Sequence, residues 1–197
     1  MRVALSSVMV VAVMMGMSCA TPSTTERENL PPLQTVKRVD LERYLGTWFE
    51  IASIPQRFQQ GCTATTATYS PGDDGAIHVR NRCRKDGFTG RESVAEGTAR
   101  VVDTTTNAKL EVSFFGPFGG DYWIIDLDEG YQWAVVGSPT RDYLWILSRT
   151  PTLDEAVYRG IIERLRSQGY DPLRLQMTPQ PPLPEIAAPS STLPAID

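Results

Sequence analysis

The chain has 197 residues, of which 41% are hydrophobic and 21% are charged, so it has enough apolar side chains to form the core of a globular domain. The formal net charge is −4 and the lysines and arginines form no long block, which argues against a nucleic-acid-binding surface. A small basic group lies on a predicted strand and the loop after it. We interpret this group as a solvated edge, and a contact to an anion or a lipid headgroup is the alternative. It consists of Arg80, Arg82, Arg84 and Lys85.

The first 18 residues have the pattern of a secretory signal peptide. Arg2 gives a positive start, and the segment Val3–Met17 is almost wholly apolar. This run is too short for a comfortable transmembrane helix, but it has the length of a signal-peptide core and ends in small residues. We therefore expect residues 1–18 to be a signal peptide and the mature protein to be exported.

The segment Gly16-Met17-Ser18-Cys19-Ala20 resembles a bacterial lipobox, in which the cysteine becomes the lipidated first residue of the mature protein. It departs from the usual pattern at Gly16, where leucine is common, and a plain secretory signal is the alternative. The resemblance implies a lipid anchor with a palmitate chain on Cys19. Ala20 stands where an aspartate is linked to inner-membrane retention, so we expect the anchor in the outer membrane.

Two proline-containing segments flank the part of the chain that is expected to fold. Residues 19–38 are polar and show no periodicity, so we interpret them as a flexible tether. Residues 179–197 contain six prolines, which are incompatible with a helix or a central strand, and we expect a disordered tail. The folded domain should therefore span residues 39–178.

Between these segments, runs with strand propensity alternate with turn residues. Eight such runs predict an all-β fold, an eight-stranded antiparallel up-and-down β-barrel without open edges, and a two-sheet sandwich is the alternative. The predicted strands are Gly46–Ser53, Thr63–Ser70, Ala76–Arg84, Ser93–Val102, Lys109–Phe115, Tyr122–Leu127, Tyr131–Gly137 and Tyr143–Ser148.

One α-helix should follow the last strand. Leu153, Val157, Ile161 and Leu165 are each four residues apart and form a single apolar stripe, and Gly169 ends the pattern. We expect this helix to pack on the outside of the barrel. A helix that binds a partner or a membrane is the alternative.

Alternation along the strands predicts which side chains face the barrel interior. Glu96, Arg100 and Glu111 mark the outer face of their strands, because charged side chains belong in water. Many inward residues are small, which leaves space for a ligand in an apolar cavity. The alternative is that Tyr143, Trp145 and another large residue, Phe114, fill the space. The residues predicted to face inward include Val79, Asn81, Ala95, Gly97, Val112 and Phe114.

The hairpin between the second and third predicted strands brings two cysteines together. If Ser70 pairs with Gly75, then Cys62 lies directly opposite Cys83, within the Cα separation that a disulfide spans. The same register places small side chains of the second strand, Thr66 among them, on the inner wall. We expect a disulfide in this exported protein, and a reactive thiol at one of the two cysteines is the alternative.

The sequence resembles the lipocalin family at three places. Gly46-x-Trp48 is similar to the first lipocalin signature, Tyr131 lies in a segment placed like the second, and Arg149 resembles the arginine of the third. The detailed similarity, over about residues 39–178, is to bacterial lipocalins and apolipoprotein D-like proteins. The resemblance implies that Trp48 closes the barrel floor and that Arg149 lies across it, which are structural roles.

The resemblance also implies a hydrophobic ligand in the barrel, such as a fatty acid or a lysophospholipid, and a role in maintaining the cell envelope. It implies ligand contacts at Asn81, Phe114, Tyr122 and Trp145. Alternation independently places Asn81 and Phe114 inside. The full predicted ligand set is Asn81, Phe114, Tyr122, Trp145, Val79, Val112, Ala95 and Tyr143.

The sequence shows no pattern typical of a metal site, a cofactor or a catalytic triad. His78 is the only histidine, and its strand position faces outward. Glu50 faces inward near Trp48, where a buried carboxylate could act as an acid, so an enzyme acting on a bound lipophile is the alternative to a carrier. A third hypothesis is an interaction module that uses the aromatic barrel mouth. We expect a monomer or a weak dimer.

Overall fold

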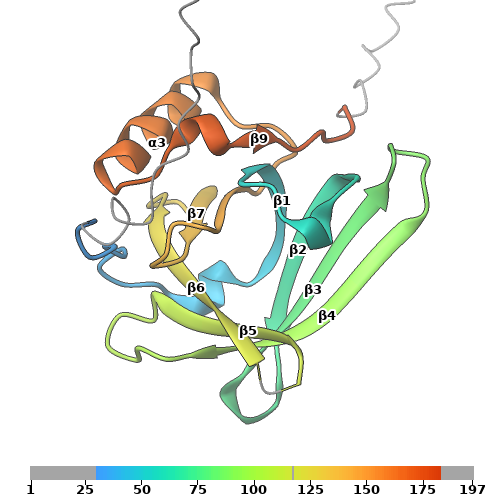
Figure 1. The fold of residues 1–197 in the computed structure, drawn as a ribbon. Coiled ribbons are helices and arrows are strands. Elements are labelled where there is room, and N and C mark those ends of the chain that lie inside the picture. The colour runs from blue at the N-terminus through green and yellow to red at the C-terminus, as the bar shows by residue number, and fades with distance from the viewer. Residues whose placement is uncertain (1–29, 117, 183–197) are drawn as a thin grey trace, which may run out of the picture. The chain divides into compact units, whose positions relative to one another are not determined.

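The computed structural model describes residues 30–116 and 118–182, which contain a closed antiparallel β-barrel (Figure 1). Each barrel strand pairs with the next in sequence, and β1 pairs with both β8 and β2, which closes the barrel. This topology confirms the predicted up-and-down barrel and not the sandwich. The barrel strands are β1 (Gly46–Ser53), β2 (Cys62–Pro71), β3 (Ile77–Lys85), β4 (Glu92–Val101), β5 (Lys109–Phe115), β6 (Phe118–Leu127), β7 (Trp133–Gly137) and β8 (Leu144–Ser148).

Because successive strands are antiparallel, their connections alternate between the two ends of the barrel. We call one end the closed end, because the short helix α2 (Leu41–Tyr44) packs there; Val39 N, just before α2, donates to Thr106 O at 2.7 Å. The closed end comprises residues 72–76, 102–108 and 128–132. We call the other end the mouth. The mouth comprises residues 54–61, residues 86–91, the turn between β5 and β6, and residues 138–143.

Helix α3 (Glu155–Ser167) packs on the outer wall of the barrel, as predicted (Figure 1). Asp154 caps its first turn, because the carboxylate accepts two backbone N–H hydrogen bonds at 2.8 and 3.1 Å. No helix in the described part of the chain is long and apolar enough to cross a membrane. The apolar stripe and the barrel wall form one buried cluster, which includes Ile161, Leu165, Ile125, Val135 and Ile146.

Several of the described residues before Val39 pack against the barrel, although they belong to the predicted tether. Leu33 is buried in the cluster under α3, and Val36 N donates to Ile124 O at 3.0 Å. Arg141 Nη2, in the mouth, donates to Pro31 O at 2.6 Å. The predicted signal peptide and Cys19 lie outside the described residues.

The C-terminal segment closes a gap between β1 and β2. Strand β9 (Gln176–Met177) pairs with the last residues of β1, and Ala64 N on β2 donates to Pro179 O at 2.8 Å. Gln180 Nε2 donates to Glu50 O at 2.8 Å and to Thr65 O at 2.9 Å. Pro179 and Gln180, which we assigned to the tail, are therefore hydrogen-bonded to the barrel. Residues 183–197 of that tail lie outside the described residues.

The predicted register of the β2–β3 hairpin is wrong. Ser70 pairs with His78 and not with Gly75, because residues 72–76 all belong to the turn. The partner is shifted by three residues, and an odd shift turns the opposite face of a strand inward.

The inner wall contributed by β2 therefore differs from the prediction. Tyr69 and Ala67 face inward, because they pair with Val79 and Asn81. Thr66, predicted to line the interior, pairs instead with an outward arginine of β3. A large aromatic side chain thus occupies a wall that we expected to be lined by small residues.

The predicted disulfide between Cys62 and Cys83 is confirmed, although the two cysteines are not direct partners. Cys62 pairs with Lys85, and the cysteine Cα atoms are 5.4 Å apart. A β-bulge in β2, where Ala64 has a φ of 50°, shifts the register locally.

Candidate functional site

Trp48 and Arg149 seal the closed end of the barrel. The guanidinium carbon of Arg149 lies 3.7 Å from the centroid of the Trp48 ring, and Trp48 is fully buried. Trp48 Nε1 donates to Tyr44 O at 2.8 Å. Arg149 also donates to Thr47 O at 3.0 Å and to Arg43 O at 2.7 Å, so one side chain joins the end of β8 to β1 and α2.

Gly46 and Tyr131, the other two signature residues, lie beside this seal. Gly46 has a φ of +93°, and a Cβ atom there would lie 3.3 Å from Arg149 Nη1. Tyr131 Oη accepts a hydrogen bond from Asp40 N at 2.8 Å, and the Arg43 guanidinium lies 4.0 Å from the Tyr131 ring centroid. The three signature segments thus meet at the closed end, where they hold the N-terminal segment against the barrel.

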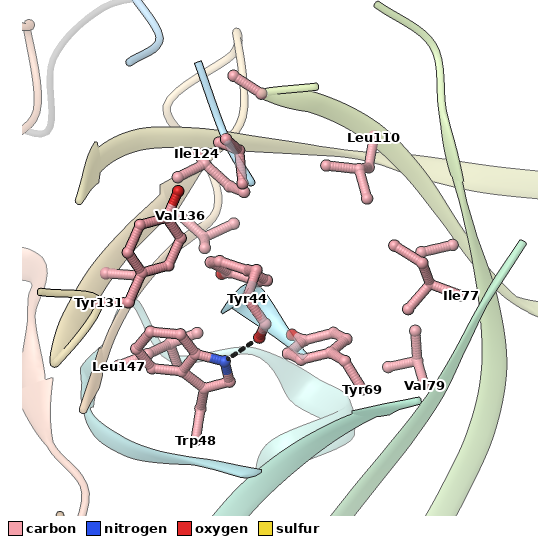
Figure 2. Packing of buried hydrophobic residues seen from close by; sticks show 14 residues of the cluster. Tyr44, Trp48, Tyr69, Ile77, Val79, Leu110, Ile124, Tyr131, Val136 and Leu147 are labelled. Atoms are coloured by element: carbon pink, nitrogen blue, oxygen red, sulfur yellow. Dashed lines mark hydrogen bonds between the residues drawn. The ribbon is translucent and has the colours of Figure 1, made fainter. Parts of the chain in front are cut away.

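Three tyrosines from distant parts of the chain meet inside the barrel. Figure 2 shows Tyr44 and Tyr69 close to each other beside Trp48. Tyr122 Oη lies 2.8 Å from Tyr44 Oη and 2.7 Å from Tyr69 Oη. We predicted Tyr122 as a site residue but not its two partners. Tyr69 was missed because of the wrong hairpin register, and Tyr44 because it lies outside the strands, where alternation carries no signal.

The tyrosine cluster is neutral and has one hydroxyl proton to spare. Burial raises the pKa of Tyr69 to about 12 and raises the pKa values of Tyr44 and Tyr122 well above the ordinary tyrosine value. Each of the three hydroxyls therefore keeps its proton at neutral pH, and the two hydrogen bonds use two of the three protons. The third proton has no acceptor among the described residues, so it is available to an acceptor on a ligand.

Asn81 adds a second unused polar group to the inner wall. It pairs with Ala67 on β2 and with Ala95 on β4, which places all three on the inner face. The Oδ1 atom of Asn81 is buried and has no hydrogen-bond partner among the described residues. Because buried amide oxygens almost always have a partner, this atom is placed to accept from a ligand or from water.

The wall around these polar groups is largely apolar. Val79 is buried in the inner core cluster, and three predicted ligand residues besides Tyr122 pack against that cluster while remaining partly exposed. These three are Val112, Phe114 and Trp145.

The small residues of β4 do not simply leave empty space. A Cβ atom at Gly97 would lie 2.8 Å from Cδ1 of Phe114 and 2.5 Å from Ser113 O. Phe114 therefore uses the room that Gly97 provides, as in the alternative in which large side chains fill the interior. A pocket of about 440 Å³ opens beside this contact, between β4 and β5. Besides Phe114 and Gly97, its lining includes the outward residues Glu96, Arg100 and Glu111, so this pocket is not an apolar space in the barrel interior.

Gln59 connects the β1–β2 loop to the barrel wall at the mouth. Trp145 Nε1 donates to Gln59 Oε1 at 3.0 Å, and Gln59 Nε2 donates to Glu50 Oε2 at 2.7 Å. Tyr143 lies in the loop before β8, where it is exposed and stacks on Trp145 with ring centroids 5.8 Å apart. Gln59 is not among the predicted site residues, because no periodic pattern identifies a loop residue that reaches across the mouth.

The carboxylate of Glu50 is buried and bound on both oxygens. Besides Gln59, its Oε1 accepts from Ser53 Oγ at 2.8 Å and from Thr178 Oγ1 at 2.6 Å. The side chain thereby joins β1 to the C-terminal segment. A pocket of about 540 Å³ lies between the β1–β2 loop and this segment, and its lining includes Glu50, Gln56, Gln59, Gln60, Met177 and Thr178.

Within the described ranges, no group of three His, Cys, Asp or Glu residues is placed to hold a metal ion. His78 is exposed on the outer face, where it pairs with Ser70 and Thr98.

Comparison with known proteins agrees with this architecture. The lipocalin-like domain model matches residues 39–180. Temperature-induced lipocalin-1 of Arabidopsis thaliana is 42% identical over 161 residues, which cover 77% of this chain and 85% of the relative. Outer membrane lipoprotein Blc of Escherichia coli K12 is 40% identical over 175 residues, which cover 86% of this chain and 93% of the relative.

A solved structure with the same fold is insecticyanin from the tobacco hornworm Manduca sexta. It aligns with a TM-score of 0.62 at 20% sequence identity, and the alignment covers 76% of this chain and 85% of that one. The fold, the sequence relatives and the family match agree, and the chain belongs to the lipocalin family.

Proposed function

We propose that the chain binds an oxygen-bearing lipid, such as a fatty acid or a lysophospholipid, inside the barrel and stores or carries it at the cell envelope. The observation that carries the proposal is the buried, unpartnered Oδ1 of Asn81 on a largely apolar inner wall. A lipid hydroxyl would donate to this oxygen. After a half-turn of the amide group, Nδ2 would donate to a carboxylate or an ester carbonyl instead.

The tyrosine cluster supports the same class of ligand. Its spare hydroxyl proton suits an acceptor oxygen, and the neutral phenols bring no charge into the barrel. The hydrocarbon part of the ligand would contact the remaining predicted site residues, among them Val79, Val112 and Phe114, and burial of its apolar surface would supply most of the affinity.

We also propose that the mature protein is exported and held at the outer membrane by a lipid on Cys19. The chain has three cysteines, and the disulfide uses Cys62 and Cys83, so Cys19 is the one left for modification. The relative from Escherichia coli, which aligns over most of both chains, is named an outer membrane lipoprotein. Mass spectrometry of the protein extracted from its own membranes would identify both the acyl chains on Cys19 and any lipid in the barrel.

We favour a carrier over an enzyme because of the environment of Glu50. Its two oxygens accept three side-chain hydrogen bonds, from Ser53, Gln59 and Thr178. These bonds favour a structural role, in which Glu50 holds β1 against the β1–β2 loop and the C-terminal segment. A general acid needs its proton free for a substrate. Lipid turnover by the purified protein that is lost in Glu50→Gln would favour the enzyme instead.

Displacement of a fluorescent fatty acid from the purified protein tests the carrier proposal. Asn81→Leu keeps the side-chain size but removes the polar atoms, and we expect the dissociation constant to rise about tenfold, the effect of roughly one lost hydrogen bond. Arg80→Ala is the matched control, because Arg80 lies on the same strand but faces outward, in an exposed ion pair with Glu96. Unchanged affinity in Asn81→Leu, or no fatty-acid binding by the unaltered protein, would contradict the proposal.

A further inference from the structure

Exposed aromatic side chains collect at the mouth of the barrel. Each of the four connections at this end carries one, either within the loop or directly beside it. Phe118 is 84% exposed and Phe58 is 66% exposed, so these rings have little contact with the rest of the protein. The set, which we call the aromatic rim, consists of Phe58, Phe88, Phe118 and Tyr143.

Two more exposed apolar side chains lie on the C-terminal segment next to the rim. Met177 pairs with Ala52 near the end of β1, and Leu173 precedes Arg174, which donates from Nη1 to Arg141 O in the mouth at 3.1 Å. Of the large hydrophobic side chains that are exposed among the described residues, Val102 alone lies at the closed end. Exposed apolar surface is thus concentrated at one end, and such concentrations mark interaction sites.

Charge is also distributed unevenly between the two ends. The three loops at the closed end carry five acidic residues and no basic residue, and α2 and Arg149 beside them add Glu42, Arg43 and Arg149, so acidic residues remain in excess there. The loops of the mouth carry three arginines and two aspartates. Arg57 and Arg91 are exposed there, each next to or near a rim phenylalanine, and neither forms an ion pair with another described residue. An anionic surface would therefore attract the mouth and repel the closed end.

The chain enters the folded domain at the mouth end. Pro31, near the start of the described residues, accepts a hydrogen bond from Arg141 in the β7–β8 loop. Twelve residues, 19–30, separate this point from an anchor on Cys19, and even a fully extended chain of that length spans only about 40 Å. An anchored domain could thus reach the bilayer with its mouth, and its N-terminal attachment favours that end over the closed end.

We propose that the mouth of this lipocalin docks on an anionic lipid bilayer. Phe58, Phe88 and Phe118 enter the interfacial layer of the bilayer, and Arg57 and Arg91 face the phosphate groups of the lipids. Aromatic rings suit this layer because they combine an apolar body with a polarisable face. Docking has a purpose only if the proposed lipid binding holds, because a docked mouth lets a lipid pass between the bilayer and the barrel without crossing water.

Co-sedimentation with phospholipid vesicles tests docking without help from the anchor. A chain that begins at Ala20 lacks the signal peptide and Cys19, yet keeps both hydrophobic clusters, which lie within residues 33–175. Vesicles of phosphatidylethanolamine with phosphatidylglycerol provide the anionic surface, and phosphatidylcholine vesicles provide the neutral one. We expect binding to the anionic vesicles, weaker binding to the neutral ones, and loss of the difference at high salt.

A triple variant, Phe58→Ser, Phe88→Ser and Phe118→Ser, removes the apolar part of the rim. Burial of one phenylalanine side chain corresponds to about tenfold or more in an equilibrium constant, so we expect partitioning onto anionic vesicles to fall at least about tenfold. Val102→Ser is the matched control, because it removes a similarly exposed apolar side chain, 60% exposed, from the closed end. It should sediment like the unaltered protein.

Fatty-acid binding in vesicle-free solution separates this inference from the proposed function. The triple variant should keep its affinity for a soluble fatty acid, which also shows that it is folded. Docking is wrong, and lipid carriage stands, if the unaltered protein binds fatty acid but does not bind anionic vesicles. The same conclusion follows if the triple variant co-sediments with anionic vesicles to the same extent as the unaltered protein. If neither the unaltered protein nor the triple variant binds fatty acid, the proposed carrier function is wrong, whatever the result of vesicle co-sedimentation. A dimer that the triple variant abolishes, in a protein that does not bind vesicles, would assign the rim to self-association and overturn the proposal.

A second measurement does not depend on removing the rim. Phe88→Trp and Val102→Trp each add one tryptophan to the same background of four. Brominated phosphatidylglycerol quenches tryptophans that reach the bilayer, so added quenching is expected for Phe88→Trp and not for Val102→Trp. Equal quenching of the two variants would refute a docked mouth.

Discussion

Removal of the Tyr122 hydroxyl should destabilise the fold more than removal of either partner hydroxyl. Tyr122 Oη is the middle atom of the cluster, 2.8 Å from Tyr44 Oη and 2.7 Å from Tyr69 Oη. Tyr122→Phe breaks both hydrogen bonds and leaves two hydroxyls without a partner on side chains that are almost fully buried. Each stranded group costs about 1–3 kcal/mol, so we expect the free energy of unfolding to fall by roughly 2–6 kcal/mol.

Tyr69→Phe is the matched comparison. It removes one hydrogen bond and leaves the contact between Tyr44 and Tyr122 intact, so the expected loss is only about 1 kcal/mol. Urea unfolding with the disulfide intact measures both variants, and a shift of the midpoint without a change of slope identifies a change of stability. If Tyr122→Phe is no less stable than Tyr69→Phe, the hydroxyls of Tyr44 and Tyr69 do not depend on the Tyr122 hydroxyl for a partner. The count of a single spare proton in the cluster would then be refuted.

The barrel interior also has a titratable group and a tight backbone contact that can be tested. The pKa of Tyr69 is about 12 in the folded state against about 10 in the unfolded state, so its contribution to stability is complete below pH 10 and is lost as the pH rises from 10 to 12. Thermal unfolding of Tyr69→Phe should therefore depend less steeply on pH in that window than that of the unaltered protein, and equal slopes would contradict the assignment. Gly97→Ala should lower the free energy of unfolding by roughly 1–3 kcal/mol, because the new Cβ meets Ser113 O at 2.5 Å and the Phe114 ring at 2.8 Å. Gly120→Ala is its control, since a Cβ there meets nothing within 4 Å; equal effects on urea unfolding would show that the tight contact does not matter.

Local pattern was sufficient for the elements that alternate cleanly. The predicted bounds of Lys109–Phe115 agree with β5, because one face of that strand is apolar and its ends are marked by turn residues. The predicted bounds of Gly46–Ser53 also agree with β1, although both faces of that strand carry buried side chains. The apolar stripe of α3 predicted its face against the barrel, since a period of four residues leaves a single buried side. Three short signatures were enough to indicate the family.

The composition of the candidate site depended on tertiary structure. The five-residue turn at 72–76 decided which face of β2 lies inside, and the local sequence is compatible with more than one register. Tyr44, Tyr69 and Tyr122 meet only because barrel closure brings α2, β2 and β6 together.

The same reason applies to the space inside the barrel. Sequence alone predicted small residues on β4, and only the packing of β5 shows that Phe114 occupies the room beside Gly97. Periodicity along the chain was therefore enough to predict the barrel and its helix. The disulfide was also predicted, because both cysteines belong to one hairpin, but the register used to pair them was wrong by three residues, and a β-bulge in β2 brings them together. No local pattern shows which polar groups lie unpartnered inside the barrel or which exposed aromatic rings lie at its mouth, because both arrangements depend on contacts between residues far apart in the chain.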